Sequence, residues 1–462
     1  MSPGGYPAAV LFVNSGVQVV ALLTFSAFAD YGNYRKVLLR WSTYACSIIL
    51  ILVVFCNTGS AVWMAGVLRI LMGVFFVQTN VYYNAYLPLL TGQSPEVLEL
   101  TGAAAEKKQE ELADNMSSKG FGCGYCGGMT MQIVAWIIFL VFQCDATDIG
   151  KTCTEEKYTF HRVFWIGFCI CLCGVWWLIF SIYTFAHLKE RAGGPFPQGV
   201  NMLCLGWQKT GETLYEVFRL RNTLLYVVGY FIWSDGIATI VNVSTLYIDE
   251  DDIDSAPCNI TSIIVNGTNT YDITGDCAKD SGKFMMLVGA TVLALIGVFV
   301  ILFIQNAFKL SSKTLLMTQL LIYGVISVGS ASGFMKAFNG MGYYLCMVPM
   351  MLMLGSQQAY QRSIYSSLSP VGKEAQMFAF YTITDKGSSL IGYAVIAVVH
   401  TRTESYLGAF WYCALAFFSS AVILYFVDVQ QGMRDAGKGE PTEDDEVQLG
   451  PRSSTNSSTV RF

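Results

Sequence analysis

The chain alternates between long apolar runs and short polar breaks. Each run holds about 20 residues with few charges, which is the length an α-helix needs to cross the hydrocarbon core of a bilayer. The pattern predicts eleven membrane-spanning helices, at about residues 7–29, 38–57, 61–87, 119–142, 160–187, 222–247, 283–305, 313–332, 339–360, 375–399 and 406–428.

The composition supports this interpretation. Hydrophobic residues make up 53% of the chain and charged residues only 13%, about half the charged share of a soluble protein. We therefore predict an all-α membrane protein whose surroundings are lipids. The first run has no basic residue before it and is too long for a signal-peptide core, so we interpret it as a retained span. No segment resembles a nucleic-acid-binding patch.

The break between the first two spans sets the orientation. Arg35 and Lys36 are adjacent cations there, and positive charge marks the cytoplasmic side of a membrane protein. Alternation from this loop puts most of the 28 basic residues, and the C-terminus, in the cytoplasm. The orientation follows from this bias.

The long polar segment 188–221 divides the spans into five and six, as in transporters built from two repeated bundles. In this segment Trp207, Leu214 and Phe218 alternate with charges, which predicts a helix lying on the membrane surface. A second helix outside the spans is expected at 94–118. The predicted domains are an N-terminal bundle (1–190), a cytoplasmic linker (191–221), a C-terminal bundle (222–430) and a disordered cytoplasmic tail (431–462).

The loop 248–282 is predicted to face away from the cytosol. It holds two glycosylation sequons, at Asn259 and Asn266, together with Cys258 and Cys277. Glycans and disulfides both form on the non-cytosolic side. We predict a Cys258–Cys277 disulfide and name Cys144 and Cys153, in another loop on that side, as a second candidate pair. Free thiols in loops are the alternative.

Charges inside the spans are costly and therefore point to function. Asp235 is followed by Gly236, where a helix can unwind around a ligand, and we expect it to meet a substrate ammonium or a proton. The alternative is an interhelical hydrogen bond. Lys386 could pair with Asp235, and Arg69 could bind a substrate carboxylate or pair with Asp385.

Two further groups lie near the cytoplasmic ends of spans. In the first, a carboxylate, a turn glycine and two cations follow one another and could latch helix ends together; an ordinary charged turn is the alternative. Its members are Asp30, Gly32, Arg35 and Lys36. The second group could line a polar path or stabilise a gate, and consists of Gln78, Asn80, Tyr82, Tyr83 and Asn84.

The sequence contains little that would indicate an enzyme. The three histidines, His161, His187 and His400, lie near helix ends. No phosphate loop, metal-binding helix motif or nucleophile elbow is present in the sequence. We predict no catalytic residue, no metal site and no cofactor.

Several stretches resemble one transporter family. The residues 28–36 (FADYGNYRK), 81–88 (VYYNAYLP) and 233–240 (WSDGIATI), with 120–128 and 372–376, resemble the autophagy-related protein twenty-two family of vacuolar amino-acid effluxers. That family belongs to the major facilitator superfamily. The resemblance implies a twelve-helix fold, a cytoplasmic tail and export of amino acids. The family's first helix has no counterpart here, which puts a complete substrate cavity in doubt.

Together these observations predict a secondary transporter of the major facilitator fold. We expect residues 7–187 to rock against 222–428 and to export amino acids, such as the neutral leucine, from a vacuole- or lysosome-like compartment to the cytosol, linked to autophagic recycling. Two alternatives stay open: a carrier of the same fold for a sugar or organic anion, and a membrane scaffold or receptor that transports nothing. The sequence does not determine the oligomeric state.

Overall fold

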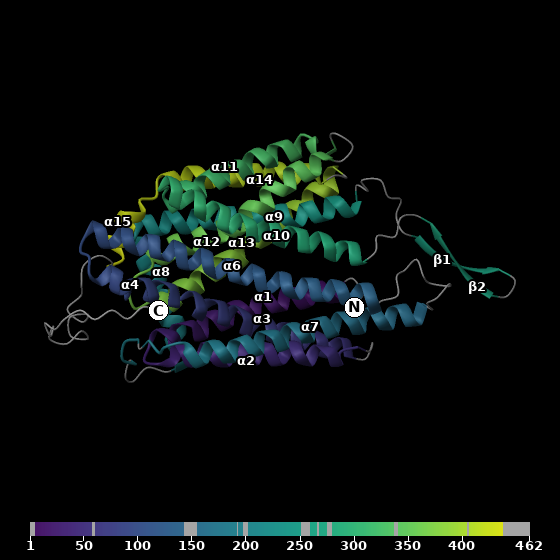
Figure 1. Cartoon of the computed structure of the whole chain (residues 1–462), viewed down its shortest axis with the longest axis horizontal. Coiled ribbons are helices and arrows are strands. Elements are labelled where there is room, and N and C mark those ends of the chain that lie inside the picture. Colours follow the sequence, from purple (N-terminus) through teal and green to yellow (C-terminus); the bar gives the residue numbers. More distant parts are fainter. Residues whose placement is uncertain are drawn as a thin grey trace.

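A computed structural model of the chain is almost entirely helical (Figure 1). The structure describes residues 5–57, 61–142, 155–191, 193–196, 202–250, 259–265, 268–274, 280–336, 341–403 and 406–437. The elements of the first half are α1 (Gly5–Phe25), η1 (Ser26–Asp30), α2 (Tyr34–Leu52), η2 (Val53–Phe55), α3 (Val62–Asn84), α4 (Tyr86–Gly92), α5 (Pro95–Leu98), α6 (Ala103–Phe142), α7 (Glu155–His187) and α8 (Met202–Arg219). The second half consists of α9 (Arg221–Glu250), β1 (Asn259–Val265), β2 (Thr268–Thr274), α10 (Asp280–Phe308), α11 (Ser312–Ala331), η5 (Phe334–Lys336), α12 (Met341–Leu368), α13 (Glu374–Thr403), α14 (Leu407–Tyr425) and α15 (Val429–Asp435).

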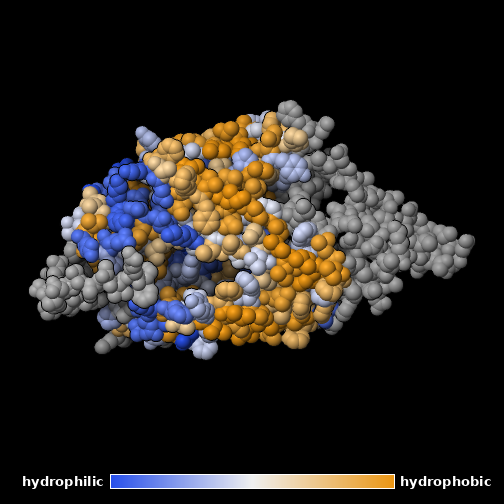
Figure 2. Space-filling model, in the orientation of Figure 1, coloured by the Kyte–Doolittle hydropathy of each residue, from blue (hydrophilic) through white to orange (hydrophobic). Residues whose placement is uncertain are grey.

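The helices confirm the predicted all-α membrane fold. Within the described residues, nine helices are long and apolar enough to cross a membrane. The helices α12 and α13 are just as long, at 28 and 30 residues, but carry more polar side chains. These polar residues are buried inside the protein, as Gln357, Arg362 and Gln376 are. Figure 2 shows the resulting broad apolar band, with hydrophilic residues gathered beyond one side of it.

The long helices form two groups that lie side by side (Figure 1). In the N-terminal bundle α1 and α2 pack on α3, and α7 packs on α2. In the C-terminal bundle α9 and α11 both pack on α14, and α10 packs on α12. The helix α6 packs mainly on α10 and α12, so it forms the boundary between the bundles. The end of the molecule that carries residues 30–36 is called the latch end below; the β1–β2 hairpin lies beyond the opposite end.

Glycines set the closest helix approaches. A Cβ on Gly297 of α10 would lie 1.5 Å from the Leu352 carbonyl oxygen of α12, and a Cβ on Gly355 would lie 2.7 Å from that of Ala294. A Cβ on Gly122 of α6 would lie 2.7 Å from the Phe299 ring. Only glycine allows these backbones to come so close, as is common for helix packing in membranes. The helices α10 and α12 therefore lie very close to each other inside the C-terminal bundle, and α6 packs closely on α10.

Three elements differ from the sequence expectations. The separate helix expected at 94–118 is instead the short α5 followed by α6, a single helix of 40 residues. At 1.5 Å per residue α6 is about 60 Å long, roughly twice the hydrocarbon thickness, so it extends beyond the bilayer. The helix α15 occupies the start of the segment expected to be disordered, and its first turn is capped by the Asp428 carboxylate. Two strands, rich in Ile and Thr, pair as an antiparallel hairpin in the loop 248–282.

Some predicted features cannot be placed. Cys144, Cys153, Cys258, Cys277 and Asn266 lie outside the described residues. The other sequon residue, Asn259, is the first residue of β1. The predicted disulfides and glycosylation sites therefore stay predictions.

Candidate functional site

The loop at residues 30–36 connects the two bundles. The Asp30 carboxylate accepts hydrogen bonds from the backbone N–H groups of Ala375 (2.8 Å) and Gln376 (3.0 Å), which begin α13. The first N–H groups of a helix have no partner within the helix and attract negative charge. Asp30 therefore acts as a cap, supplied by one bundle, for a helix of the other.

Arg35 contacts both acids of this cluster. One guanidinium nitrogen lies 2.9 Å from the Asp30 carboxylate and 3.1 Å from that of Glu374. The three side chains are at most 3% exposed. Breaking such a buried group by removing one partner is costly, because a charge is left without compensation. We refer to Asp30, Arg35 and Glu374 as the buried latch.

Gly32 and Lys36 complete the predicted loop. Gly32 has a φ of +46°, a conformation that favours glycine. Its N–H donates to the Gly194 carbonyl and its own carbonyl accepts from the Gly193 N–H, so the loop is fixed to the segment after α7. Lys36 is half-buried and does not belong to the buried latch.

Arg362 of α12 forms a second connection between the bundles. Its guanidinium donates to the Ser117 hydroxyl (3.0 Å), the Ser117 carbonyl (3.2 Å) and the Asn84 side-chain oxygen (3.3 Å). It also lies over the rings of Phe121 (4.7 Å) and Tyr83 (5.4 Å). Two of the predicted polar residues, Tyr83 and Asn84, thus contact the opposite bundle.

Two more polar contacts cross between the bundles at the latch end. Arg434 of α15 donates to the Glu106 carboxylate at the start of α6 (2.9 Å). Farther along α6, the Asp114 carboxylate accepts from Gln305 (2.6 Å) and from the Ser312 hydroxyl. In the described part of the chain, the polar contacts between the bundles gather in this half of the molecule, which is therefore closed in this structure.

The adjacent charges Asp385 and Lys386 lie midway along α13. Asp385 is eleven residues past Glu374, the first residue of α13, or about 16 Å along the helix at 1.5 Å per residue. Its carboxylate accepts from the Tyr230 hydroxyl (3.2 Å) and the Ser234 hydroxyl of α9. Lys386 lies 3.2 Å from Asp385, and their side chains are 47% and 33% exposed, respectively. Lys386 therefore pairs with its neighbour and not with Asp235.

Aromatic rings and amides surround this charged pair on one side. Tyr230 stacks on Tyr381 of α13, with ring centroids 4.1 Å apart and planes at 9°. The ring centroid of Tyr365 in α12 lies 4.8 Å from that of Tyr381. The Gln361 side-chain oxygen accepts from the Trp233 indole N–H (3.2 Å). Three helices of the C-terminal bundle, α9, α12 and α13, thus build one polar and aromatic surface.

Asp235 lies deeper inside the C-terminal bundle. It is 1% exposed and accepts hydrogen bonds from the Gly392 N–H of α13 (2.9 Å) and the Tyr412 hydroxyl of α14. A Cβ on Gly392 would lie 2.8 Å from the Asp235 carboxylate, so glycine permits this contact. These contacts match the interhelical alternative, while a role on the transport path stays a prediction.

The remaining predicted residues lie on α3. The Gln78 amide donates to the Ala21 carbonyl (2.8 Å) and the Tyr82 hydroxyl to that of Phe25 (3.3 Å), so both hold α3 against α1. Asn80 is half-buried. Arg69 is exposed and approaches the Met72 sulfur at 4.0 Å, without the expected contact to Asp385.

Known proteins resemble this chain over most of its length. The sequence profile of the family described as "Vacuole effluxer Atg22 like" matches residues 8–271 and 278–437. Autophagy-related protein 22-2 of Aspergillus niger is 24% identical over 503 residues, covering 94% of this chain and 78% of the relative. Autophagy-related protein 22-1 of Phaeosphaeria nodorum is 28% identical over 461 residues, covering 91% and 75%.

Solved structures agree on the fold. The major facilitator transporter FucP in its outward conformation has a TM-score of 0.61 at 12% identity, covering 92% of this chain and 90% of FucP. The proton:xylose symporter XylE has a TM-score of 0.57 at 11% identity, covering 94% and 88%. These likenesses show the fold of the major facilitator transporters. The matched family profile shows that the chain belongs to the Atg22-like vacuole effluxer family, a family of transporters and not of enzymes.

Proposed function

We propose that this transporter exports amino acids, neutral ones such as leucine among them, from a vacuole-like compartment to the cytosol. The observation that carries the proposal is the Asp385–Lys386 pair, half-exposed and midway along α13. A lysine that faced lipid at this depth would be costly, so we assign its exposed surface to a water-accessible space between the bundles. An amino acid carries one ammonium and one carboxylate, and Asp385 and Lys386 offer the matching charges side by side.

The surroundings of the pair support the same substrate class. The hydroxyls of Tyr230 and Ser234 orient the Asp385 carboxylate, which leaves Lys386 as its charged partner until a substrate arrives. A zwitterion would replace the Asp385–Lys386 contact by two ion pairs, and the stacked Tyr230 and Tyr381 rings offer an apolar surface to its side chain. A neutral sugar would gain nothing from this exchange of charges. The pair therefore favours an amino acid over a sugar.

The latch contacts support a rocking mechanism. The buried latch and Arg362 connect the bundles at the latch end, which the positive charge of the loop at residues 30–36 assigns to the cytosol. In this state the site would receive substrate from the vacuolar side. Release to the cytosol would require these contacts to break as the bundles rock.

Export from proteoliposomes tests the proposal. Purified protein is reconstituted, the vesicles are loaded with labelled L-leucine, and efflux is compared with that of protein-free vesicles. Asp385→Asn and Lys386→Gln are each expected to slow export about 10- to 100-fold, the effect of losing one charge-assisted contact of roughly 1.5–3 kcal/mol. Glu99→Gln, which removes an exposed charge at the latch end, is the matched control.

Substrate analogues separate the remaining alternatives. N-acetyl-leucine lacks the ammonium and leucine amide lacks the carboxylate, so neither should be exported at the rate of leucine. Export of L-fucose in place of leucine would identify a sugar carrier. No transport of any of these solutes, or equal rates for the Asp385, Lys386 and Glu99 variants, would refute the proposal.

A further inference from the structure

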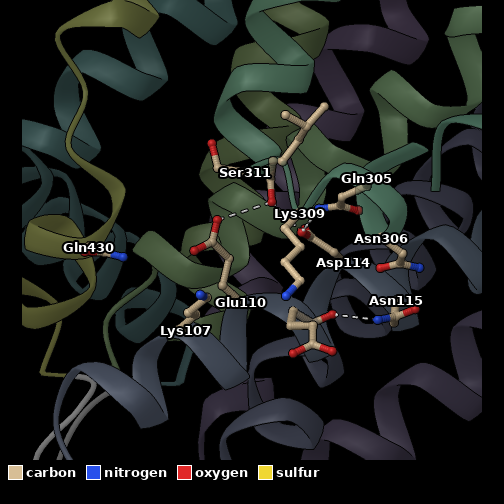
Figure 3. A pocket seen from close by; sticks show the side chains of 12 residues that line it. Lys107, Glu110, Asp114, Asn115, Gln305, Asn306, Lys309, Ser311 and Gln430 are labelled. Atoms are coloured by element: carbon tan, nitrogen blue, oxygen red, sulfur yellow. Dashed lines mark hydrogen bonds between the residues drawn. The ribbon is translucent and has the colours of Figure 1, made fainter. Parts of the chain in front are cut away.

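A polar cavity lies at the latch end, away from the Asp385–Lys386 pair. Its volume is about 680 Å³, and its walls come from α6, the α10–α11 connection and Gln430 of α15 (Figure 3). This size lies within the range of about 300–1,000 Å³ found for small-molecule sites. Apart from Leu310, the residues that line it are polar or charged. We call it the latch-end cavity.

Two carboxylates of the cavity share one hydroxyl group. The Ser312 hydroxyl contacts the Glu110 carboxylate (3.3 Å) and the Asp114 carboxylate. A hydroxyl has one proton and cannot donate it to both acids at the same time. Asp114 is 3% exposed, and its Oδ1 atom has no hydrogen-bond partner among the described residues. A buried acceptor without a donor is costly.

The charges of the lining differ in burial: Asp114 is buried and Glu110 half-buried, whereas Glu111 is exposed. Glu110 and Asp114 are one helical turn apart on α6, where two like charges repel each other. Lys107 and Lys309 are exposed at the rim. In Figure 3 the side chains of Glu110 and Lys309 extend into the same space from opposite walls. A ligand with an ammonium at one end and a carboxylate at the other would satisfy both the acids inside and the lysines at the rim.

We propose that the latch-end cavity binds a free amino acid with a polar side chain, separately from the transport site. Its ammonium donates to Glu110, one helical turn from the buried Asp114, its carboxylate contacts Lys107 or Lys309, and its side chain meets the amides of Asn115 and Asn306. The lining supports a polar side chain because every residue in it except Leu310 is polar or charged.

Binding here also has a consequence for transport, which rests on the proposed function. The acids belong to the N-terminal bundle, whereas Lys309 and Ser312 belong to the C-terminal bundle. Rocking would separate the two walls, so a ligand that contacts both binds the closed latch end more tightly and increases its population. An amino acid that accumulates on the latch side thereby slows its own release and that of other amino acids.

Calorimetry on the purified full chain tests the binding, with L-glutamine as the probe. Glu110→Gln is expected to weaken binding about 10- to 100-fold, since it removes a charge-assisted acceptor for the ammonium. N-acetyl-L-glutamine, which lacks the ammonium, should bind no better to the wild type than to Glu110→Gln. Glu99→Gln should keep wild-type affinity, because Glu99 lies outside the cavity and away from the Asp385–Lys386 pair. Glu110 is only half-buried, so its variant is expected to fold.

Two results would overturn the proposal. One is equal L-glutamine affinity in the wild type and in Glu110→Gln. The other is that Asp385→Asn loses binding while Glu110→Gln keeps it, which would place the ligand at the transport site. In leucine-loaded proteoliposomes, L-glutamine added on the latch side should slow export by the wild type and not by Glu110→Gln. If leucine is not exported at all, the proposed function fails, while the calorimetric result still decides the binding.

Discussion

Replacing Asp30 by asparagine changes the buried latch without changing its size. Two of the contacts that Asp30 accepts, from Ala375 and Gln376, cross between the bundles. Its contact with Arg35 lies within one bundle, so it persists when the bundles separate. The contacts to α13 therefore favour the closed latch end, and the like charge of Glu374, which Arg35 holds beside Asp30, opposes part of that effect.

The size of the effect follows from those contacts. A hydrogen bond to a charged group contributes about 1.5–3 kcal/mol, and a carboxylate at a helix N-terminus adds about 0.3–1 kcal/mol. Asparagine keeps one acceptor oxygen and turns its amide donors toward the N–H groups of α13. We expect Asp30→Asn to destabilise the closed latch end by about 2 kcal/mol, which changes the closed-to-open ratio about 30-fold.

Fluorescence energy transfer across the latch end measures this ratio. Dyes attached through non-natural amino acids at Tyr34 and Val371, which are 45% and 56% exposed, report on the two bundles. The matched control is Glu216→Gln, which breaks the Glu216–Lys373 pair at the same end. That pair is partly exposed, at 41% and 29%, and is expected to contribute at most about 1 kcal/mol. Equal changes of the closed-to-open ratio in Asp30→Asn and Glu216→Gln would refute the expectation that the buried contacts contribute more than the exposed pair.

Two further predictions concern Asp235 and α15. Asp235→Asn should lower the free energy of unfolding by about 1–3 kcal/mol, because α9 loses a charged acceptor for Gly392 and Tyr412. Export per folded molecule should stay unchanged. A loss of export beyond the loss of folded protein would instead support the transport role predicted from the sequence. Arg434→Ala should speed hydrogen exchange of the backbone amides of residues 429–435. The reason is that Glu106, whose side chain is 4% exposed, loses its charged partner. Unchanged exchange rates would show that α15 is held by its apolar contacts alone.

Part of the site could be predicted from residue order alone. The sequence 30–36 places a carboxylate, a glycine and cations between two spans, and the structure brings Asp30 and Arg35 together there. Arg362, Glu374, Asp114 and Glu106 were not predicted as site residues. Arg362 lies at the end of a span in the second half, as Asn84 does in the first, and this weak repetition was the available signal. The contact between Arg362 and Asn84 joins residues that are 278 positions apart.

The sequence by itself determined the class of protein, the position of most helices and the family, because hydropathy and short motifs are local properties of the chain. Only the tertiary structure decided which charges meet. Asp235 and Asp385 are both acids within spans, but one is enclosed between α9, α13 and α14 and the other is half-exposed beside Lys386. The reason is geometric: the rotation of each helix and the docking of the two bundles set these surroundings, and both depend on contacts between residues far apart in the chain.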